Sequence, residues 1–391
     1  MVIYMKKIIF KILPIIFIPI LFFLSIICIH SNTIIKNPYP IYFSFITCII
    51  LYVINNLFFK ITLKLKILHK LLFILYYFSI IILSILVYHN VTFKTWLITT
   101  AKGTTNHKYI ADIFYNKKEI EKILNNNSIT EPNEVFNPNL IEIKKNKKKK
   151  DYEIKTFKFK GKKAYIAYIY DPSKLKVATS KLVGYKGDFA TNIAEENKAL
   201  LAINGGGFKD YMYDNTGGVP TGITVSNGNV AYDDYSNKNF IGLTKDNKLI
   251  LIKNATISDI KNNNIRDGVS MGPFLIINGK KAKITGNGGK GYAARTAIGQ
   301  RKDGTITLVV LDSNYSRTKG ASIKDLLKIM SKNKAINAAN LDGGTSSVMI
   351  LPKKEANKYK ECKNNYCYIN DPITYKFEHK TRKIPTIFYL K

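Results

Sequence analysis

The stretch of sequence that decides the fold begins with ITLVVLD (306–312) and ends with AINAANLDGGTSS (335–347). Each segment opens with a short apolar run that predicts a buried strand. Between them, Ala321–Met330 predicts a helix, and Ser322 and Asp325 stand at the spacing of a capping box. Together the segments predict a strand–helix–strand unit whose two strands run parallel in one sheet.

Acidic residues close both predicted strands, at Asp312 and Asp342. Carboxylates that follow two parallel strands lie on the same edge of a sheet, where sites of α/β type form. The residues after Asp342 are two glycines and three hydroxyl residues: Gly343, Gly344, Thr345, Ser346 and Ser347. Such a segment suits the lining of a sugar or phosphate site; the alternative is an Asp-Gly turn with capping hydroxyls.

Further short segments extend this pattern over the second half of the chain. Strands are predicted at residues 152–159, 164–170, 199–203, 222–225, 249–252, 274–277 and 294–299, and a helix at 189–198. No internal repeat is evident. We therefore predict one strand-rich α+β catalytic domain over residues 151–391.

A glycine-rich turn follows the apolar segment 199–203. It comprises Asn204, Gly205, Gly206 and Gly207. Glycines there let the backbone approach a ligand and offer N–H groups to an anion, although a plain tight turn is the alternative. No P-loop or dinucleotide fingerprint fits, because no Gly-Lys-Ser/Thr follows and Asp210 replaces the last glycine. A second tight turn, at Gly272, is expected to bring backbone to the same ligand.

Arg295 and Thr296 stand at the mouth of another predicted strand. Arginine is scarce in this lysine-rich chain, so Arg295 indicates a task that lysine cannot perform. A fixed bidentate grip on phosphate or carboxylate is such a task, and a structural salt bridge is the alternative. His379 is the single histidine of the predicted domain. A Ser–His–Asp hydrolase or a His-ligated zinc enzyme is therefore difficult to build.

Three uncharged apolar runs fill the N-terminal region: Ile12–Ile29, Ile41–Phe59 and Leu71–Tyr88. Each has at least 18 residues, enough to cross the hydrocarbon core of a bilayer as a helix. Lysines gather before the first run and between the second and third, which predicts a cytoplasmic N-terminus. Residues 1–90 are thus expected to form a membrane anchor with three spans that leaves the catalytic domain extracytoplasmic.

Residues 91–150 are expected to connect the anchor to the domain. Apolar positions over Thr105–Leu124 predict an amphipathic helix at the membrane surface. Residues 125–150, rich in Asn, Pro and Glu and ending in a lysine run, predict a linker. Near the C-terminus, Cys362 and Cys367 are expected either to form a disulfide or to remain two free thiols.

The formal net charge is +33, nearly all of the positive charge being lysine. Lys, Ile, Asn and Tyr are abundant together, as in chains from AT-rich genomes, which explains part of this charge. The remainder suits anionic lipids or a polyanionic envelope polymer as partners. Nucleic acid is not an expected partner, because no recognition helix or aromatic RNA-binding signature is present. No cofactor is expected, and the sequence leaves a metal open.

Taken in order, six blocks of residues resemble the phosphodiester glycosidase family over most of residues 164–390. The blocks are Asp171-Pro172-Ser173, residues 202–208, Pro220-Thr221-Gly222, Gly272-Pro273, residues 295–299 and residues 340–344. The leader with three apolar runs is similar to that of membrane-anchored members from Gram-positive bacteria. The resemblance implies hydrolysis of a sugar-1-phosphodiester in envelope or exopolysaccharide glycans.

This resemblance gives the candidate residues provisional roles. Asp312 and Asp342 are expected to flank the anomeric carbon, while Arg295 holds the departing phosphate together with the amides of residues 205–207. Asn204, Thr296, Ser346 and Ser347 are expected to orient sugar hydroxyls. Two alternatives stay open: a binder of envelope polymers that has no catalytic activity, and a metal-dependent phosphodiesterase that cleaves the P–O bond.

Overall fold

The chain forms two units, Met1–Asn126 and Asn127–Lys391. The computed structural model describes residues 89–104, 107–144, 150–209, 216–313, 320–356, 362–363, 365–372 and 381–391. The three predicted spans lie outside the described residues. No helix within these described ranges combines the length and apolar character that a bilayer crossing requires.

In the first unit, the described part consists of three short helices. They are α4 (Val91–Lys102), α5 (Tyr109–Phe114) and α6 (Lys117–Asn125). The single helix predicted over Thr105–Leu124 was wrong, because the chain turns between α5 and α6. Tyr115 is extended, and the Asn116 side chain accepts a hydrogen bond of 2.9 Å from the Glu119 amide, which starts a new helix.

Apolar side chains of these helices face one another. Ala111, Ile120 and Ile123 pack against Ile98 and Ala101 of α4 in one buried cluster. The face that the sequence assigned to the membrane surface is therefore mostly covered by protein, because α4 supplies an apolar partner.

The second unit begins well before the boundary that composition indicated. Residues 127–143, here called the strap, were predicted to be part of a linker, and this prediction was wrong. Strand β1 (Ile129–Thr130) pairs with β15 (Lys283–Ile284), and Ile141 is only 2% exposed. Further along, the Glu142 amide donates a hydrogen bond of 2.9 Å to the Lys302 carbonyl. The strap is thus packed on the domain along its length.

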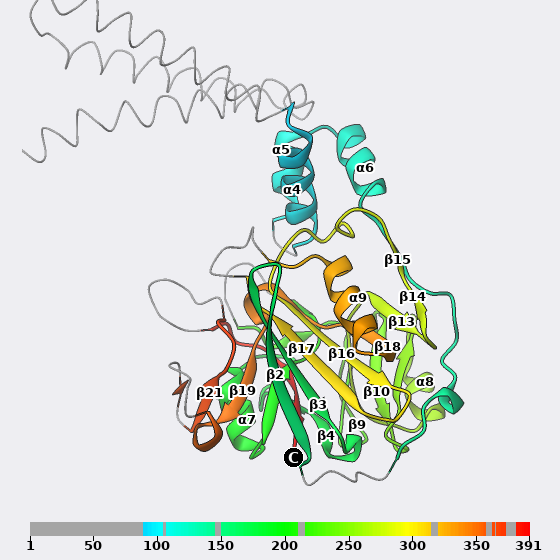
Figure 1. Cartoon of the computed structure of the whole chain (residues 1–391), viewed down its shortest axis with the longest axis vertical. Coiled ribbons are helices and arrows are strands. Elements are labelled where there is room, and N and C mark those ends of the chain that lie inside the picture. Colours follow the sequence, from blue (N-terminus) through cyan, green and yellow to red (C-terminus); the bar gives the residue numbers. More distant parts are fainter. Residues whose placement is uncertain are drawn as a thin grey trace, which may run out of the picture. The chain divides into compact units, whose positions relative to one another are not determined.

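Three antiparallel-paired sheets make up most of the second unit (Figure 1). The seven-stranded sheet has the order β14-β13-β18-β16-β17-β3-β2, the six-stranded sheet β20-β21-β19-β5-β22-β4, and the five-stranded sheet β11-β10-β12-β8-β9. Strands of the seven-stranded sheet are β2 (Tyr152–Phe159), β3 (Lys162–Ile169), β13 (Phe274–Ile277), β14 (Lys280–Lys281), β16 (Arg295–Arg301), β17 (Ile306–Leu311) and β18 (Ala335–Asn340). Those of the six-stranded sheet are β4 (Leu175–Thr179), β5 (Leu201–Asn204), β19 (Met349–Pro352), β20 (Cys362–Lys363), β21 (Tyr366–Tyr368) and β22 (Thr386–Leu390). Those of the five-stranded sheet are β8 (Ile223–Ser226), β9 (Asn229–Asp233), β10 (Phe240–Thr244), β11 (Leu249–Ile252) and β12 (Ile265–Ser270).

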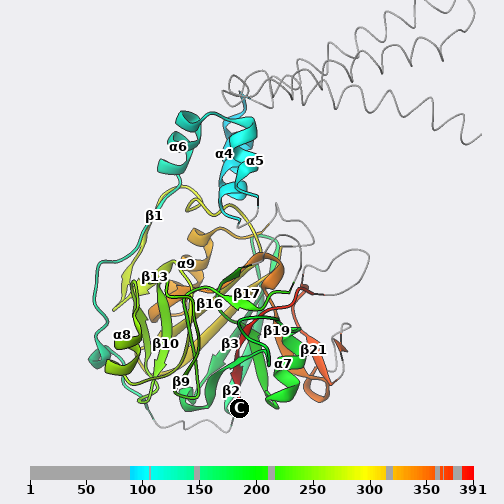
Figure 2. The same ribbon diagram turned by 180° about the vertical axis from the view of Figure 1, so that it is seen from behind.

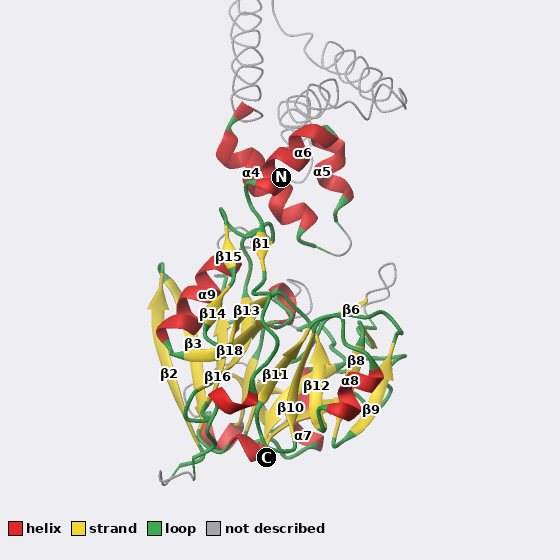
Figure 3. Ribbon diagram, turned by 90° about the vertical axis from the view of Figure 1, so that its right-hand side faces the viewer, coloured by secondary structure: helices red, strands yellow, loops and turns green. Residues whose placement is uncertain are grey.

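The three sheets share one hydrophobic core, and a helix covers the other face of each. On β3, Tyr165, Ala167 and Ile169 face the shared core, while the alternate residues face helix α9 (Ile323–Lys332). The remaining helices, α7 (Ala190–Glu196) and α8 (Ile257–Asn262), cover the six- and five-stranded sheets (Figure 2). The prediction of a strand-rich α+β domain is confirmed (Figure 3).

The strand–helix–strand unit predicted from residues 306–347 is present. Helix α9 carries the capping box, in which Ser322 and Asp325 exchange hydrogen bonds. Strand β16 lies between β17 and β18 and is antiparallel to both, so β17 and β18 are parallel but not adjacent. In the six-stranded sheet, a disulfide joins Cys362 to Cys367 across β20 and β21, the first of the two alternatives.

Candidate active site

Several strands of the seven- and six-stranded sheets begin or end at one edge. Strand β18 ends at Asn340 and β16 begins at Arg295, while β5 ends at Asn204. Hydrogen bonds connect the two sheets here: the Asp342 amide donates to the Gly205 carbonyl at 3.2 Å, and the Asn204 side chain donates to the Asp342 carbonyl at 2.7 Å. The residues predicted from three distant segments therefore meet at this edge.

Arg295 is the charged centre of this edge and is only 7% exposed. Its Nε donates to the Ala321 carbonyl at 3.0 Å, and its Nη2 donates to the carbonyls of Lys290 and Gly291 at 2.7 and 2.9 Å. The Nε hydrogen and both Nη2 hydrogens are thus donated to backbone, so neither edge of the guanidinium is open for the predicted bidentate grip and only Nη1 remains for a ligand. Nη1 lies toward Gly343, where an added Cβ would come within 3.7 Å of it.

Electrostatics connect Arg295 to Asp342. Burial lowers the pKa of Arg295 to about 10, and the negative charges of Asp342 and Asp325 partly oppose that shift. The guanidinium therefore stays protonated at neutral pH and presents a positive charge beside Asp342. Arg295 and Asp342 therefore lie at one corner of the domain, as their expected roles require.

The backbone of Asp342 is fixed on both sides. Its amide donates to the Gly205 carbonyl at 3.2 Å, and its carbonyl accepts from Asn204 Nδ2. Gly343 cannot carry a side chain without crowding, because its Cβ would lie 3.0 Å from the Ala294 carbonyl oxygen. Gly344 has a φ of +63°, in the left-handed region that favours glycine. The two glycines thus hold a partly exposed carboxylate in a fixed position.

A buried chain of polar side chains supports this position. Thr296 Oγ1 donates to Asn204 Oδ1 at 2.8 Å, and the same oxygen of Asn204 accepts the Val348 amide at 3.2 Å. The hydroxyls of Thr296 and Ser347 are 3.1 Å apart. Asn204, Thr296 and Ser347 are almost inaccessible to solvent, so they position the loop after Asp342 instead of contacting a sugar directly.

Asp312 has a different environment from the one that the sequence suggested. It is 1% exposed, and its carboxylate accepts hydrogen bonds from Asn370 Nδ2 at 3.0 Å and from the Asp371 amide at 3.1 and 3.2 Å. Burial raises the pKa of Asp312 to about 6, although these hydrogen bonds oppose the shift. The expectation that Asp312 flanks an anomeric carbon is corrected, because protein atoms surround its carboxylate.

Asn370 and Asp371 contribute to this edge and were missed from the sequence. Asn370 Nδ2 also donates to the Ser347 carbonyl at 3.1 Å, which connects Asp312 to the loop that carries Asp342. The available signal was the segment Asn370-Asp371-Pro372, an Asp-Pro pair like the one at Asp171-Pro172. Among the described residues, no group of three or more His, Cys, Asp or Glu side chains is arranged to hold a metal ion.

The three glycines after Asn204 serve close packing. The amides of Gly205 and Gly206 donate to the carbonyl and the hydroxyl of Thr386, and that of Gly207 donates to the Ser270 carbonyl. A Cβ on Gly205 would lie 2.4 Å from Thr386 Oγ1. The predicted role of these amides as anion donors is corrected, since all three are engaged within the protein.

Three buried polar atoms at this edge have no hydrogen-bond partner within the described part of the chain. They are Ser313 Oγ, Asn340 Oδ1 and Ser346 Oγ. Buried polar atoms are normally satisfied, so these three atoms are exceptions that gather at this edge. Thr345, also predicted as substrate-binding, is partly exposed in the same loop.

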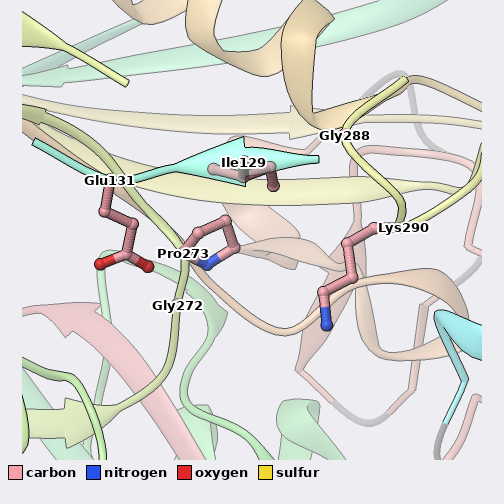
Figure 4. Close-up of a pocket in the computed structure, with 6 residues that line it drawn as sticks. All are labelled: Ile129, Glu131, Gly272, Pro273, Gly288 and Lys290. Carbon is pink, nitrogen blue, oxygen red and sulfur yellow. The ribbon is translucent and has the colours of Figure 1, made fainter. Parts of the chain in front are cut away.

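Two clefts flank the turn at Gly272. The first, of about 400 Å³, is lined by Ile129, Glu131, Gly272, Pro273, Gly288 and Lys290 (Figure 4). The second, of about 350 Å³, is lined by Thr221, Asn237, Lys238, Asn239, Asn254, Ser270, Met271 and Gly272. The prediction of a tight turn that brings backbone to a ligand-sized space is consistent with this arrangement.

The fold and the edge define a strand-rich α+β domain in which a carboxylate stands beside a buried guanidinium. Residues 197–391 match the phosphodiester glycosidase family. Through these residues the chain belongs to the phosphodiester glycosidases, a family of hydrolases.

Among curated proteins, the chain is similar to YomE, an uncharacterized protein of Bacillus subtilis strain 168 derived from the SPbeta prophage. The two are 26% identical over 217 residues, or 52% of this chain and 32% of YomE. The chain thus spans about a third of the length of that relative.

Among solved structures, the zebrafish N-acetylglucosamine-1-phosphodiester alpha-N-acetylglucosaminidase catalytic domain, auto-inhibited by its pro-peptide, is 20% identical with a TM-score of 0.49. The match covers 63% of this chain and 86% of that one. A hypothetical protein from Synechocystis is 14% identical with a TM-score of 0.43, covering 61% and 62%. A putative exported protein from Burkholderia pseudomallei K96243 has the same identity and TM-score, covering 59% and 74%.

Proposed function

We propose that the protein is an extracytoplasmic, membrane-anchored hydrolase that cleaves a sugar-1-phosphodiester bond in glycans of the cell envelope. The observation that carries this proposal is the meeting of Asp342 and Arg295 at one sheet edge, within the segment that matches the phosphodiester glycosidases. A carboxylate beside a positive charge suits a reaction in which a sugar gains positive charge while a phosphate leaves.

The proposed reaction adds water across the bond between C1 of the sugar and the phosphate oxygen. The C1–O bond breaks, its electron pair leaves with the phosphate monoester, and water supplies the hydroxyl on C1. Because a phosphate monoester is a good leaving group, charge stabilisation contributes more than protonation of the leaving oxygen. Asp342 stabilises the oxocarbenium-like transition state or activates the water, and Arg295 opposes the charge of the departing phosphate.

Three features support the location. The chain begins with three uncharged apolar runs, and lysines gather at those ends that would face the cytoplasm. The disulfide between Cys362 and Cys367 is of a kind that persists in oxidising compartments. The excess of lysine also suits an anionic polymer or lipid surface as a partner.

A product assay tests this proposal. The full-length chain in detergent would be incubated with the methyl phosphodiester of N-acetylglucosamine 1-phosphate and with matched diesters of other sugars. We expect free reducing sugar and methyl phosphate from wild type, and much slower release of both from Asp342→Asn. Release of methanol and sugar 1-phosphate would instead identify P–O cleavage, and a chelator would then test for a metal. Binding without product from any of these diesters would identify a polymer-binding protein.

A further inference from the structure

Helix α9 lies on the outside of the seven-stranded sheet (Figure 1). Apolar side chains bury its inner face against the sheet. Its outer face carries three exposed lysines, Lys324, Lys328 and Lys332. Residues four apart on a helix lie one above the other, about 6 Å apart along the axis. The three ammonium groups therefore form one row along the helix, here called the lysine stripe.

The lysine stripe is not neutralised by acidic side chains. Asp325 is the acidic residue of α9, but it is only 2% exposed and its carboxylate pairs with Lys160 at 2.7 Å. None of the three lysines lies within ion-pair distance of an acidic side chain in the described ranges. The stripe thus presents positive charge of one sign to the solvent.

This arrangement is unfavourable for an isolated helix. Like charges four residues apart repel each other, and Lys324 stands in the first turn, where the helix dipole disfavours a cation. In the first unit, by contrast, Lys94 and Lys102 of α4 and Lys117 of α6 each pair with an acidic residue. A lysine-rich composition acts on all helices alike, so it does not explain the uniform charge of α9. An anionic partner would turn this repulsion into attraction.

The spacing and the neighbours of the lysine stripe indicate the chemistry of that partner. In a linear polymer of polyols joined by phosphodiesters, the phosphates recur at an interval similar to that of the lysines. Leu327 and Ser331, which stand between the lysines on the helix surface, are both partly buried. The stripe therefore has no protruding apolar side chain that would enter a bilayer, and no aromatic ring on which a nucleic acid base would stack.

We propose that the lysine stripe is an exosite for a linear anionic polymer of polyols joined by phosphodiesters. Successive lysines pair with successive phosphates of one polymer chain, each through a charge-assisted hydrogen bond. This exosite goes beyond the function proposed above, because it requires neither Asp342 nor Arg295. It holds the protein on its polymer whether or not a bond in that polymer is cut.

Fluorescence anisotropy with end-labelled poly(glycerol phosphate) tests the exosite. The full-length Asp342→Asn protein in an uncharged detergent is the parent, because this substitution slows hydrolysis of the probe. We expect binding that weakens as salt is added. Replacing Lys324, Lys328 and Lys332 together by Gln should weaken the affinity about 100-fold. It should also reduce the slope of log Kd against log salt concentration by about 3, since three phosphate contacts are lost.

The matched control replaces three exposed lysines outside the seven-stranded sheet by Gln, namely Lys253, Lys261 and Lys354. The net charge changes equally, but the affinity should change much less, because salt screens distant charges. Thermal unfolding of both triple variants checks that each remains folded. An equal loss of affinity in the control would show that binding follows net charge, and the exosite would be rejected.

Three competitors test the identity of the ligand. Unlabelled poly(glycerol phosphate) should displace the probe at lower concentrations of phosphate groups than single-stranded DNA or vesicles of anionic lipid. Equal displacement by DNA or by the vesicles would overturn the assignment to a polyol polymer. Failure of the parent protein to bind the probe would overturn the exosite itself. Neither result bears on hydrolysis of sugar-1-phosphodiesters, which the product assay measures separately.

Discussion

Asp312 and Asp342 follow two parallel strands of the same sheet, yet the structure gives them opposite environments. Asp342 is partly exposed at a glycine-bordered corner beside a guanidinium. Asp312 is buried, and protein donors surround its carboxylate. The contrast shows that a common sheet edge brings two carboxylates near each other but does not give them a common role. Exposure and hydrogen-bond partners decide which one can reach a substrate.

Replacing the exposed carboxylate is expected to have the largest effect. Asp342→Asn removes the charge and keeps the shape, so kcat for a cleaved diester should fall about 10³-fold. Thermal unfolding should change little, because the substitution keeps the shape of the side chain and both backbone hydrogen bonds of this residue. Wild-type turnover in this variant would show that Asp342 takes no part in the chemistry. The proposed difference in role between Asp342 and Asp312 would then be wrong.

The guanidinium beside Asp342 should be the next most sensitive group. Arg295→Lys keeps a positive charge, but a single ammonium cannot reproduce the planar guanidinium that bonds these carbonyls of Ala321, Lys290 and Gly291 through two nitrogens. We expect kcat to fall about 10²-fold, with lower thermal stability. Steady-state kinetics and calorimetric unfolding measure the two effects. Retention of both properties would show that charge alone is required at this position.

Replacing Asp312 should change the free energy of unfolding and its pH dependence more than it changes turnover. The pKa of its buried carboxyl rises from 3.8 to about 6, so the folded state binds the proton more tightly than the unfolded state. Its contribution is therefore most favourable below about pH 4 and declines by about 3 kcal/mol as the pH rises through 6.

Comparing Asp312→Asn with wild type isolates this contribution. The difference in unfolding free energy between the two proteins should change by about 2 kcal/mol between pH 4 and pH 7, in the sense that wild type gains at acid pH. Denaturant unfolding at several pH values measures it, and kcat should stay within about tenfold of wild type. A loss of turnover as large as that of Asp342→Asn would restore Asp312 as a reacting group.

The smallest effect is expected from removing the disulfide of the six-stranded sheet. Cys362→Ser with Cys367→Ser removes a disulfide that closes a short loop, so stability should fall by about 2 kcal/mol and kcat should not change. Thermal unfolding with and without reductant measures this. An equal loss of turnover would show that the candidate site depends on the β20–β21 hairpin.

Much of the fold followed from local patterns in the sequence. The apolar runs of β2, β11, β13 and β17 were predicted with the bounds that the structure has, since alternation or flanking turns limit each of them. Strand β10, which contains Gly242, was missed. Gly242 interrupts its apolar run, and the strand is completed by pairing with β11 and β12 on either side.

The site was predicted in part. The meeting of Arg295 and Asp342 follows from strand order and family motifs, both of which are visible in the sequence. The roles of Asp312 and the glycines at 205–207 could not be predicted, because they depend on Asn370, which follows β21, and on Thr386 of β22. Sequence spacing gives no information about which long-range partner occupies a carboxylate or an amide.

The docked strap also determines where this protein can be cut. A soluble fragment that starts after Lys150 would lose strand β1 and leave β15 as an unpaired edge, which is a hazard for aggregation. It would also uncover the apolar surface under Phe136 and Ile141. We therefore expect a fragment that begins at Asn127 to be the shortest one that stays monodisperse during purification.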